Sequence, residues 1–310
     1  MLLQLNIFFI FSALITCGNL IIAQFLNYGV SAYADDTFYT GGAGVGITNQ
    51  LSIILLTYPF LLKTKKDILP KIMWYIIYFI GIISVFLIFM VMKRAAIVGL
   101  VVGLLVCLLF LSSRINFIKY IIASIFVLYL IFPFFENAFM TRYESRLRQT
   151  ENIDREGRVV EFLYALDEFK ESDTVQKLFG EEIFNTAATF GIKYFDRGRM
   201  IHGDITMFFY GSGLVGIIMY ILIYAGLFRE GVRYYTVLRR LPVIKDLFAV
   251  YFAILISYFA VSVTGSGTIG ERCLVFLYLG GITGVLRNII LNIKRERING
   301  SISAGIEKQH

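Results

Sequence analysis

The 310-residue sequence has few charged residues, few prolines and only two histidines. Asp, Glu, Lys and Arg together make up only 16% of the chain, whereas 57% is hydrophobic and the mean hydropathy is +0.72. Soluble domains are about one quarter charged, and a soluble fold could not bury this much apolar surface. The composition therefore excludes an ordinary soluble protein and predicts one that crosses a membrane.

Cysteine is also scarce. Cys17, Cys107 and Cys273 all lie inside apolar runs and lack the spacing of metal ligands. They exclude a disulfide framework in a loop, and we interpret them as small buried hydrophobic side chains. No cluster of carboxylates in the predicted outer segments has the spacing of metal ligands either, so we expect no metal and no other cofactor.

Apolar runs long enough to cross a membrane occur about eight times. A span needs roughly 20 apolar residues at 1.5 Å rise per residue. The runs cover residues 5–26, 45–62, 72–92, 95–111, 117–135, 207–228, 247–263 and 273–293. The first lacks the basic flank and cleavage site of a secretory signal peptide, so we expect a retained helix. The fold class is therefore an all-α polytopic membrane protein with about eight transmembrane helices.

Lysine and arginine are distributed unevenly between the connecting segments. With the N-terminus in the cytoplasm, the inner segments carry 16 of the 29 basic residues and a net charge of +11, and the outer ones −4. Because basic loops stay inside, both termini are predicted to be cytoplasmic. The excess positive charge is then a topology signal and an attraction to anionic membrane lipids, and it requires no nucleic acid.

A polar segment interrupts the apolar runs between residues 136 and 204 and holds 14 of the 22 acidic residues. We divide the chain into five helices (1–135), a large periplasmic or extracellular loop (136–205), three helices (206–293) and a cytoplasmic tail (294–310). Within the loop, apolar residues at 159, 162, 163, 166 and 169 predict an amphipathic helix over 157–169, which we expect at the membrane end of the bundle. A shorter helix is predicted over 174–179, ending at Gly180.

Two segments, 211–216 and 265–270, match G-x-G-x-x-G. Neither follows a strand in a βαβ unit, so a dinucleotide site is not expected. We interpret the first as small residues inside a membrane helix that allow close helix packing. The second is an outer loop followed by Glu271 and Arg272, which borders a candidate site.

Two residues at the outer membrane boundary are candidates for chemistry. Arg94 joins two apolar runs with no real loop between them. It lies on the predicted outer side of the membrane, where basic residues are usually scarce. Its planar guanidinium group can form two parallel hydrogen bonds to a phosphate. His202 is the only histidine besides the C-terminal His310, and its imidazole suits proton transfer near neutral pH. Asp204, two residues on, either orients His202 or is solvated.

Several features in order resemble the O-antigen ligase and Wzy-type polysaccharide polymerase superfamily. They are Lys93-Arg94-Ala95-Ala96 at a helix start, Glu156-Gly157-Arg158 at the head of the loop helix, Leu178-Phe179-Gly180, and His202 followed by Gly211, Gly213 and Gly216. The resemblance covers about residues 42–224. The chain differs in having Lys93 where Ser usually precedes the arginine, and in having fewer spans, as in an N-terminally shortened member.

The resemblance implies glycosyl transfer on the outer face of the bacterial cytoplasmic membrane, in O-antigen, capsule or exopolysaccharide synthesis. A polyprenyl-pyrophosphate-linked oligosaccharide would be the donor, and a glycan or a lipid core the acceptor. Arg94 and Arg158 would neutralise the leaving pyrophosphate, and His202 would accept the proton of the attacking hydroxyl. Asp204 and Arg272 would support the site.

The sequence is also compatible with two other classes of function. A transporter or flippase of lipid-linked sugars would carry charges at mid-membrane depth and internal repeats, and we find no convincing repeat. A purely structural subunit is the third interpretation. Polymerase and ligase differ in their acceptor, which no residue identifies.

Overall fold

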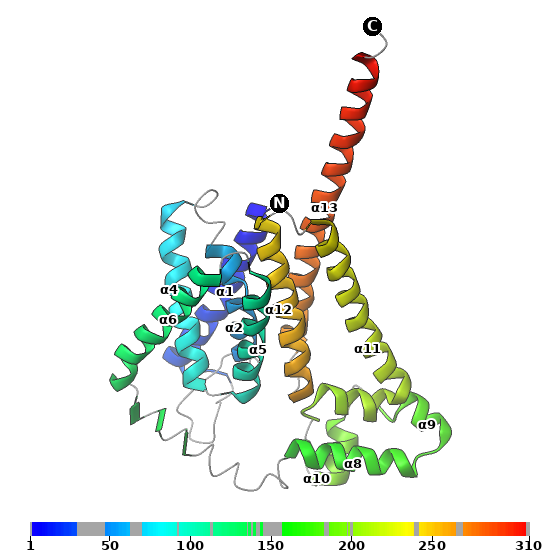
Figure 1. Ribbon diagram of the computed structural model, residues 1–310. Coiled ribbons are helices and arrows are strands. Elements are labelled where there is room, and N and C mark those ends of the chain that lie inside the picture. The colour runs from blue at the N-terminus through cyan, green and yellow to red at the C-terminus, as the bar shows by residue number, and fades with distance from the viewer. Residues whose placement is uncertain are drawn as a thin grey trace.

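The computed structural model describes residues 2–29, 47–62, 70–91, 93–111, 114–134, 136–137, 139–140, 143–144, 157–182, 186–196, 198, 201–238, 242–264 and 269–307. Within these ranges the secondary structure is helical and contains no strand (Figure 1). The all-α fold class is therefore confirmed.

Five helices are long and apolar enough to cross a membrane, as judged by length and composition within the described residues. They are α1 (Leu2–Leu26), α4 (Lys71–Val91), α11 (Asp204–Leu238), α12 (Pro242–Thr264) and α13 (Ile269–Glu307). They coincide with the first, third, sixth, seventh and eighth predicted runs. The fourth run forms a shorter apolar helix, α5 (Arg94–Phe110), of 17 residues. The number of eight spans stays a prediction.

The second predicted run is not one continuous helix. Helix α2 (Ile47–Leu55) ends after 9 residues, residues 56–57 form a turn, and the chain is helical again over 58–62. The cause is Pro59, which has no N–H to donate and disfavours helical geometry at the residue before it. The fifth run forms α6 (Arg114–Ile131) and then a 3₁₀ turn, η2 (Phe132–Phe134), that contains Pro133.

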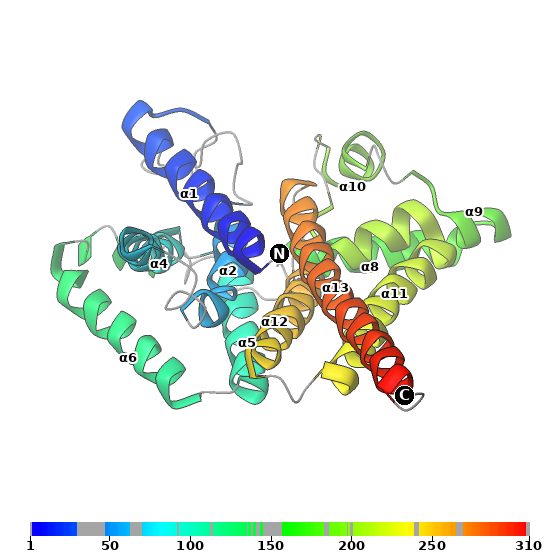
Figure 2. The same ribbon diagram turned by 90° about the horizontal axis from the view of Figure 1, so that it is seen from above.

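Helix α12 is the centre of the bundle and packs along α5 (Figure 2). The two backbones lie close together because Gly99 has no side chain: a Cβ there would come within 2.6 Å of Val261 Cγ2. The Ser257 hydroxyl donates to the Gly99 carbonyl at 2.7 Å, which satisfies its hydrogen-bonding capacity inside the apolar core. Helices α1, α2 and α4 complete one continuous hydrophobic core.

A smaller group of helices lies at the end of the molecule opposite the two termini (Figure 1). We call it the α8–α10 unit; it comprises α8 (Gly157–Glu171), α9 (Thr174–Phe179), the π-helical turn η4 (Ala187–Gly191), α10 (Ile192–Phe195) and residues 204–212 of α11. Its own apolar core contains Ala165, Phe190, Ile201 and Tyr210. The predicted helices over 157–169 and 174–179 are confirmed by α8 and α9.

The buried face of α8 differs from the one that the apolar pattern predicts. Glu161 and Ala165 are buried, whereas Val159, Phe162 and Leu163 remain exposed. The periodicity identified an apolar stripe correctly, but the small Ala165 is what fits against the rings of the unit. The apolar stripe is therefore not covered by the bundle.

Helix α11 is interrupted at Gly213, whose backbone has φ 59° and ψ −155°. The candidate span over Asp204–Leu238, which contains the predicted run 207–228, is therefore divided in two at this glycine. Glycine tolerates this left-handed φ because it has no Cβ. The break separates residues 204–212, which belong to the α8–α10 unit, from the long apolar part of α11.

Candidate functional site

His202 and Glu161 form the most specific polar contact among the predicted site residues. His202 lies just before α11, and its ring Nδ1 is 2.8 Å from Glu161 Oε1. The backbone N–H of His202 donates to Glu161 Oε2, also at 2.8 Å. The side chain of Glu161 is 1% exposed and that of His202 is 49% exposed. One buried carboxylate thus holds both the backbone and the ring of a histidine whose remaining edge is accessible.

This contact determines which ring nitrogen of His202 is available. When the Glu161 carboxylate is ionised it only accepts hydrogen bonds, so Nδ1 then carries the proton and donates to it. In the neutral imidazole, Nε2 is then left as the acceptor. A carboxylate behind a histidine in this way fixes its tautomer and stabilises the imidazolium that forms when Nε2 takes a proton.

Arg158 lies three residues before Glu161 on α8, and residues at this spacing share one face of a helix. Lys93, at the start of α5, is close enough to Arg158 and to Glu271 for their charges to act on it. Burial lowers the pKa of Lys93, the guanidinium of Arg158 lowers it further, and the carboxylate of Glu271 opposes both. The charges of Lys93, at the start of α5, and Arg158, near the start of α8, are therefore close enough to interact.

Arg94 is the first residue of α5 and its side chain is exposed. Arg94 directly follows Lys93, whose charge interacts with that of Arg158. That the two guanidinium groups grip one pyrophosphate stays a prediction.

Asp204 and Arg272 form an ion pair, with Arg272 Nη2 2.7 Å from Asp204 Oδ1. Asp204 is 1% exposed, so it is buried rather than solvated, and its ion pair with Arg272 joins the start of α11 to the start of α13. That Asp204 orients His202 stays a prediction. Next to this pair, the amide nitrogen of Asn49 on α2 donates to buried Glu271 at 3.0 Å.

The backbone of the α8–α10 unit is fixed to α11 where the glycines meet. A Cβ on Gly180, which has φ 76°, would come within 2.4 Å of the backbone of Gly211 and Ser212. The N–H of Glu181 donates to the carbonyl of Tyr210 at 2.9 Å. The close approach that the glycines of 211–216 predict is therefore found, but with the turn after α9 rather than with another membrane helix.

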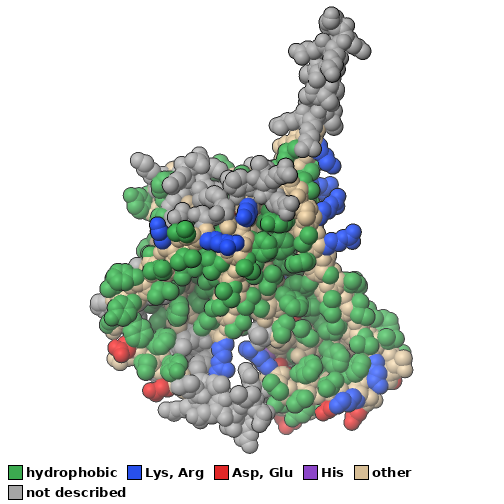
Figure 3. All heavy atoms as spheres, viewed as in Figure 1, with side chains coloured by type: hydrophobic (Ala, Val, Ile, Leu, Met, Phe, Trp, Pro, Cys, Tyr) green, Lys and Arg blue, Asp and Glu red, His purple; other side chains and the backbone are tan. Residues whose placement is uncertain are grey.

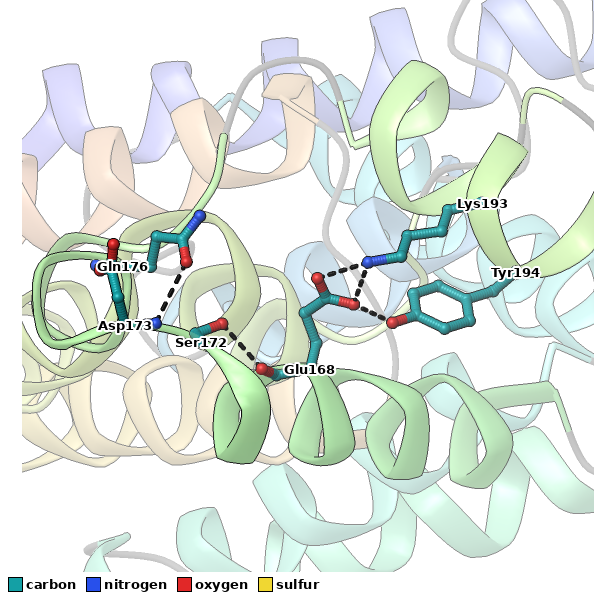
Figure 4. A network of polar contacts seen from close by, with 6 residues as sticks. All are labelled: Glu168, Ser172, Asp173, Gln176, Lys193 and Tyr194. Atoms are coloured by element: carbon teal, nitrogen blue, oxygen red, sulfur yellow. Dashed lines mark hydrogen bonds and ion pairs between the residues drawn. The ribbon is translucent and has the colours of Figure 1, made fainter.

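A polar network joins α8 to α10 (Figure 4). Lys193 Nζ lies 2.5 Å from both oxygens of Glu168, and the Tyr194 hydroxyl donates to the same carboxylate. Partial burial raises the pKa of Glu168, but the hydrogen bonds from Lys193 and Tyr194 and the charge of Lys193 lower it more, and the net pKa is lowered. The pKa of Lys193 is raised, chiefly by its hydrogen bond to Glu168.

Helix α9 begins with a capping box in the same network. The Asp173 side chain accepts from the N–H of Gln176 at 2.8 Å, and the Gln176 side chain accepts from the N–H of Asp173 at 3.2 Å. These bonds satisfy donors that the first helical turn leaves open. The capping box orders the start of α9, and the Glu168 network holds α10 against α8.

Glu161 was not among the predicted site residues, and neither Lys93 nor the buried Glu271 was given a role. For Glu161 a signal existed, since it is the one acidic residue within the first two turns of the amphipathic pattern and stands at i+3 from Arg158. Its partner lies 41 positions away, and that pairing could not be read from local spacing.

Among the described residues, no group of three or more His, Cys, Asp or Glu side chains could hold a metal ion. No known protein family matches the chain, and no curated protein matches it.

Proposed function

We propose that the chain is a membrane glycosyltransferase that transfers an oligosaccharide from a polyprenyl-pyrophosphate donor to a sugar hydroxyl. The observation that carries the proposal is the pairing of His202 with buried Glu161 on the face of α8 that also holds Arg158. A histidine with a fixed tautomer suits proton abstraction, and the neighbouring cations suit an anionic leaving group. The resemblance in sequence supports the same reaction.

The proposed setting is the bacterial cytoplasmic membrane, with eight spans, both termini inside and residues 136–205 as the outer domain. Three features support it: the apolar helices, the two termini at one end, and the α8–α10 unit at the other (Figure 1). In Figure 3, a broad apolar band lies between two charged regions: Lys and Arg side chains near the end with the termini, and Asp and Glu side chains together with further Lys and Arg at the opposite edge. This polarity agrees with the positive-inside rule.

The proposed reaction is a direct displacement at the anomeric carbon of the donor. Nε2 of His202 accepts the proton of the acceptor hydroxyl while its oxygen forms the new glycosidic bond. The bond from the anomeric carbon to the pyrophosphate oxygen breaks, and the electron pair leaves with the lipid pyrophosphate. Arg94 and Arg158 stabilise this charge without a metal, and Glu161 stabilises the imidazolium of His202.

Asp204 and Arg272 have a supporting role in this proposal. Their ion pair fixes the start of α11, and with it the position of His202 two residues earlier. The acceptor is either a growing glycan, as in a polymerase, or a lipid core, as in a ligase.

Reconstituted protein tests the proposal against the flippase alternative. Proteoliposomes containing the protein, a polyprenyl-pyrophosphate oligosaccharide and a glycan acceptor should release free polyprenyl pyrophosphate and form a longer glycan. A flippase would instead move the intact donor between leaflets. Movement of the donor without cleavage would overturn the proposed reaction.

A further inference from the structure

Helix α8 has two faces with different surroundings. One face, with Glu161 and Ala165, is buried within the α8–α10 unit. The other carries Val159, Phe162 and Leu163, which are all exposed. An apolar stripe on a helix is ordinarily turned toward a core, so its exposure here indicates that something other than the described chain covers it.

Helix α9 extends this exposed apolar surface. Val175 and Phe179 are exposed, the latter by 62%, and no residue of α9 is buried. Lys177 lies with its Nζ 6.0 Å from the centre of the Phe169 ring, so a cation borders the apolar surface. Long basic side chains at the edge of an apolar surface are typical of helices that lie in a membrane interface.

The position of α9 along the membrane axis follows from its attachment to α11. The turn at Gly180 packs on the backbone of α11 at Gly213, where the helix breaks. Directly after the break, α11 exposes Leu214, Val215 and Ile218, which begin its apolar surface. The exposed apolar side chains of α9 are therefore continuous with those of a candidate membrane span, and Figure 3 shows the apolar band reaching down over this end of the molecule.

We propose that the apolar faces of α8 and α9 rest in the outer leaflet of the bilayer and are covered by lipid. The occupant is lipid rather than a second protein because the surface continues directly from α11, whose apolar side chains face outward along much of its length. The inference rests on the membrane location in the proposed function. It adds that α8 holds His202 and Arg158 at the level of the lipid head groups, where the pyrophosphate of a lipid-linked donor lies.

Tryptophan fluorescence tests this placement in the full-length protein, because the chain has one tryptophan, Trp74. In a Trp74→Phe background, single reporters are introduced as Phe179→Trp on α9, Ile218→Trp on α11 and Asp167→Trp on the polar side of α8. Each protein is placed in nanodiscs and quenched with brominated phospholipid or with aqueous iodide. Phe162→Trp is a second reporter for the apolar face should Phe179→Trp fail to fold.

We expect the reporter at 179 to be quenched by brominated lipid several-fold more than the reporter at 167, and to be shielded from iodide. The reporter at 218 should respond like the one at 179. If 218 is lipid-quenched but 179 is quenched by iodide, this inference is overturned while the membrane location stands. If 218 is itself reached by iodide and not by lipid, the membrane location of the proposed function fails. Shielding of 179 from both quenchers would mean that protein covers it, which also overturns the inference.

Discussion

The membrane bundle and the α8–α10 unit are held together by different forces. In the bundle, α12 is surrounded by apolar side chains, and glycine allows α5 to approach it closely. Among the described residues, the apolar core of the unit contains four buried side chains. Polar contacts hold the unit together, chiefly Glu161 with His202 and Glu168 with Lys193 and Tyr194, and the pair of Asp204 with Arg272 joins it to the bundle.

This difference explains where chemistry can be placed. Most side chains buried in the bundle are apolar, although polar ones such as Asn49, Asp246 and Glu271 are buried there too. In the unit, buried carboxylates hold a partly exposed histidine and arginine in fixed orientations. Substitutions in the bundle should therefore affect the amount of folded protein, whereas those in the unit should affect activity at nearly constant folding.

The largest expected effect is loss of folded protein on Gly99→Leu. The added side chain meets Val261 and Ser257 across the closest contact between α5 and α12. Overpacking of this kind typically costs about 1–3 kcal/mol and sometimes more. Membrane-inserted protein, measured by detergent extraction and size-exclusion chromatography, should fall sharply.

Gly226→Leu is the matched control, because a Cβ at Gly226 meets nothing within 4 Å. The control should extract and elute like the wild type. Equal behaviour of the two variants would contradict the close packing of α5 against α12.

Glu161→Gln should reduce the rate of transfer by about 10- to 100-fold, a usual cost of removing a group that orients a functional histidine. The ring and the backbone of His202 bond to different oxygens of Glu161, and the glutamine replaces one of these oxygens with an NH₂ group that cannot accept, so one of the two bonds is lost in this geometry. Because Glu161 acts through His202, kcat should fall while KM for the donor stays unchanged. Glu171→Gln, exposed on the same helix, is the control and should leave both constants unchanged.

A parallel loss of folded protein in Glu161→Gln would indicate a structural role instead. Unchanged kcat in well-folded protein would remove Glu161 from the proposed mechanism.

Arg94→Lys should reduce glycan yield by about tenfold, because an ammonium cannot reproduce the planar fork that pairs with a phosphate. Arg233→Lys, exposed near the far end of α11, is the matched control and should have no effect. A complementation assay that measures glycan chain length and yield tests both. If Arg94→Ala left length and yield untouched, the pyrophosphate-binding role of Arg94 would be wrong.

The smallest expected effect is a change in the local stability of α10 on Lys193→Met. The pair with Glu168 is partly exposed, and such pairs contribute less than about 1 kcal/mol. The lowered pKa of Glu168 means that this contribution is present above pH 4.5 and is lost as pH falls through the folded pKa. The raised pKa of Lys193 means that it is present below pH 10.5 and is lost as pH rises through the folded pKa.

Hydrogen exchange of residues 192–195, compared between variant and wild type at the same pH, measures this contribution. The difference should be present at pH 7 and shrink as the medium becomes strongly acidic. Lys170→Met removes a more exposed pair with Asp167 and should give a smaller difference. A difference independent of pH would contradict the ionic origin.

Much of the helical content could be predicted from local sequence. The apolar runs at α1, α4, α12 and α13, the capping residues of α9 and the end of that helix at Gly180 all follow from short-range patterns. The interruption of the second apolar run could also have been predicted from Pro59. The break of α11 at Gly213 could not, because it depends on packing against the distant turn at Gly180.

The candidate site could be predicted only in part. Arg158 and His202 follow from the resemblance and from their position at a membrane boundary. Their assembly through Glu161, and the partnership of Asp204 with Arg272 over 68 positions, depend on tertiary contacts. The buried face of α8 was mistaken for the same reason, because what the helix packs against lies far along the chain.

In the proposed mechanism His202 accepts the proton of the attacking hydroxyl, and the rate of transfer by reconstituted His202→Ala protein measures this role. Removal of a general base typically costs about 10² to 10⁴ in rate, so His202→Ala should show almost no product while inserting at normal levels. His202→Gln keeps hydrogen bonding but not basicity; its loss of activity would support a base, and retained activity would reduce His202 to positioning the acceptor. Full activity of His202→Ala with a functional donor would contradict the account.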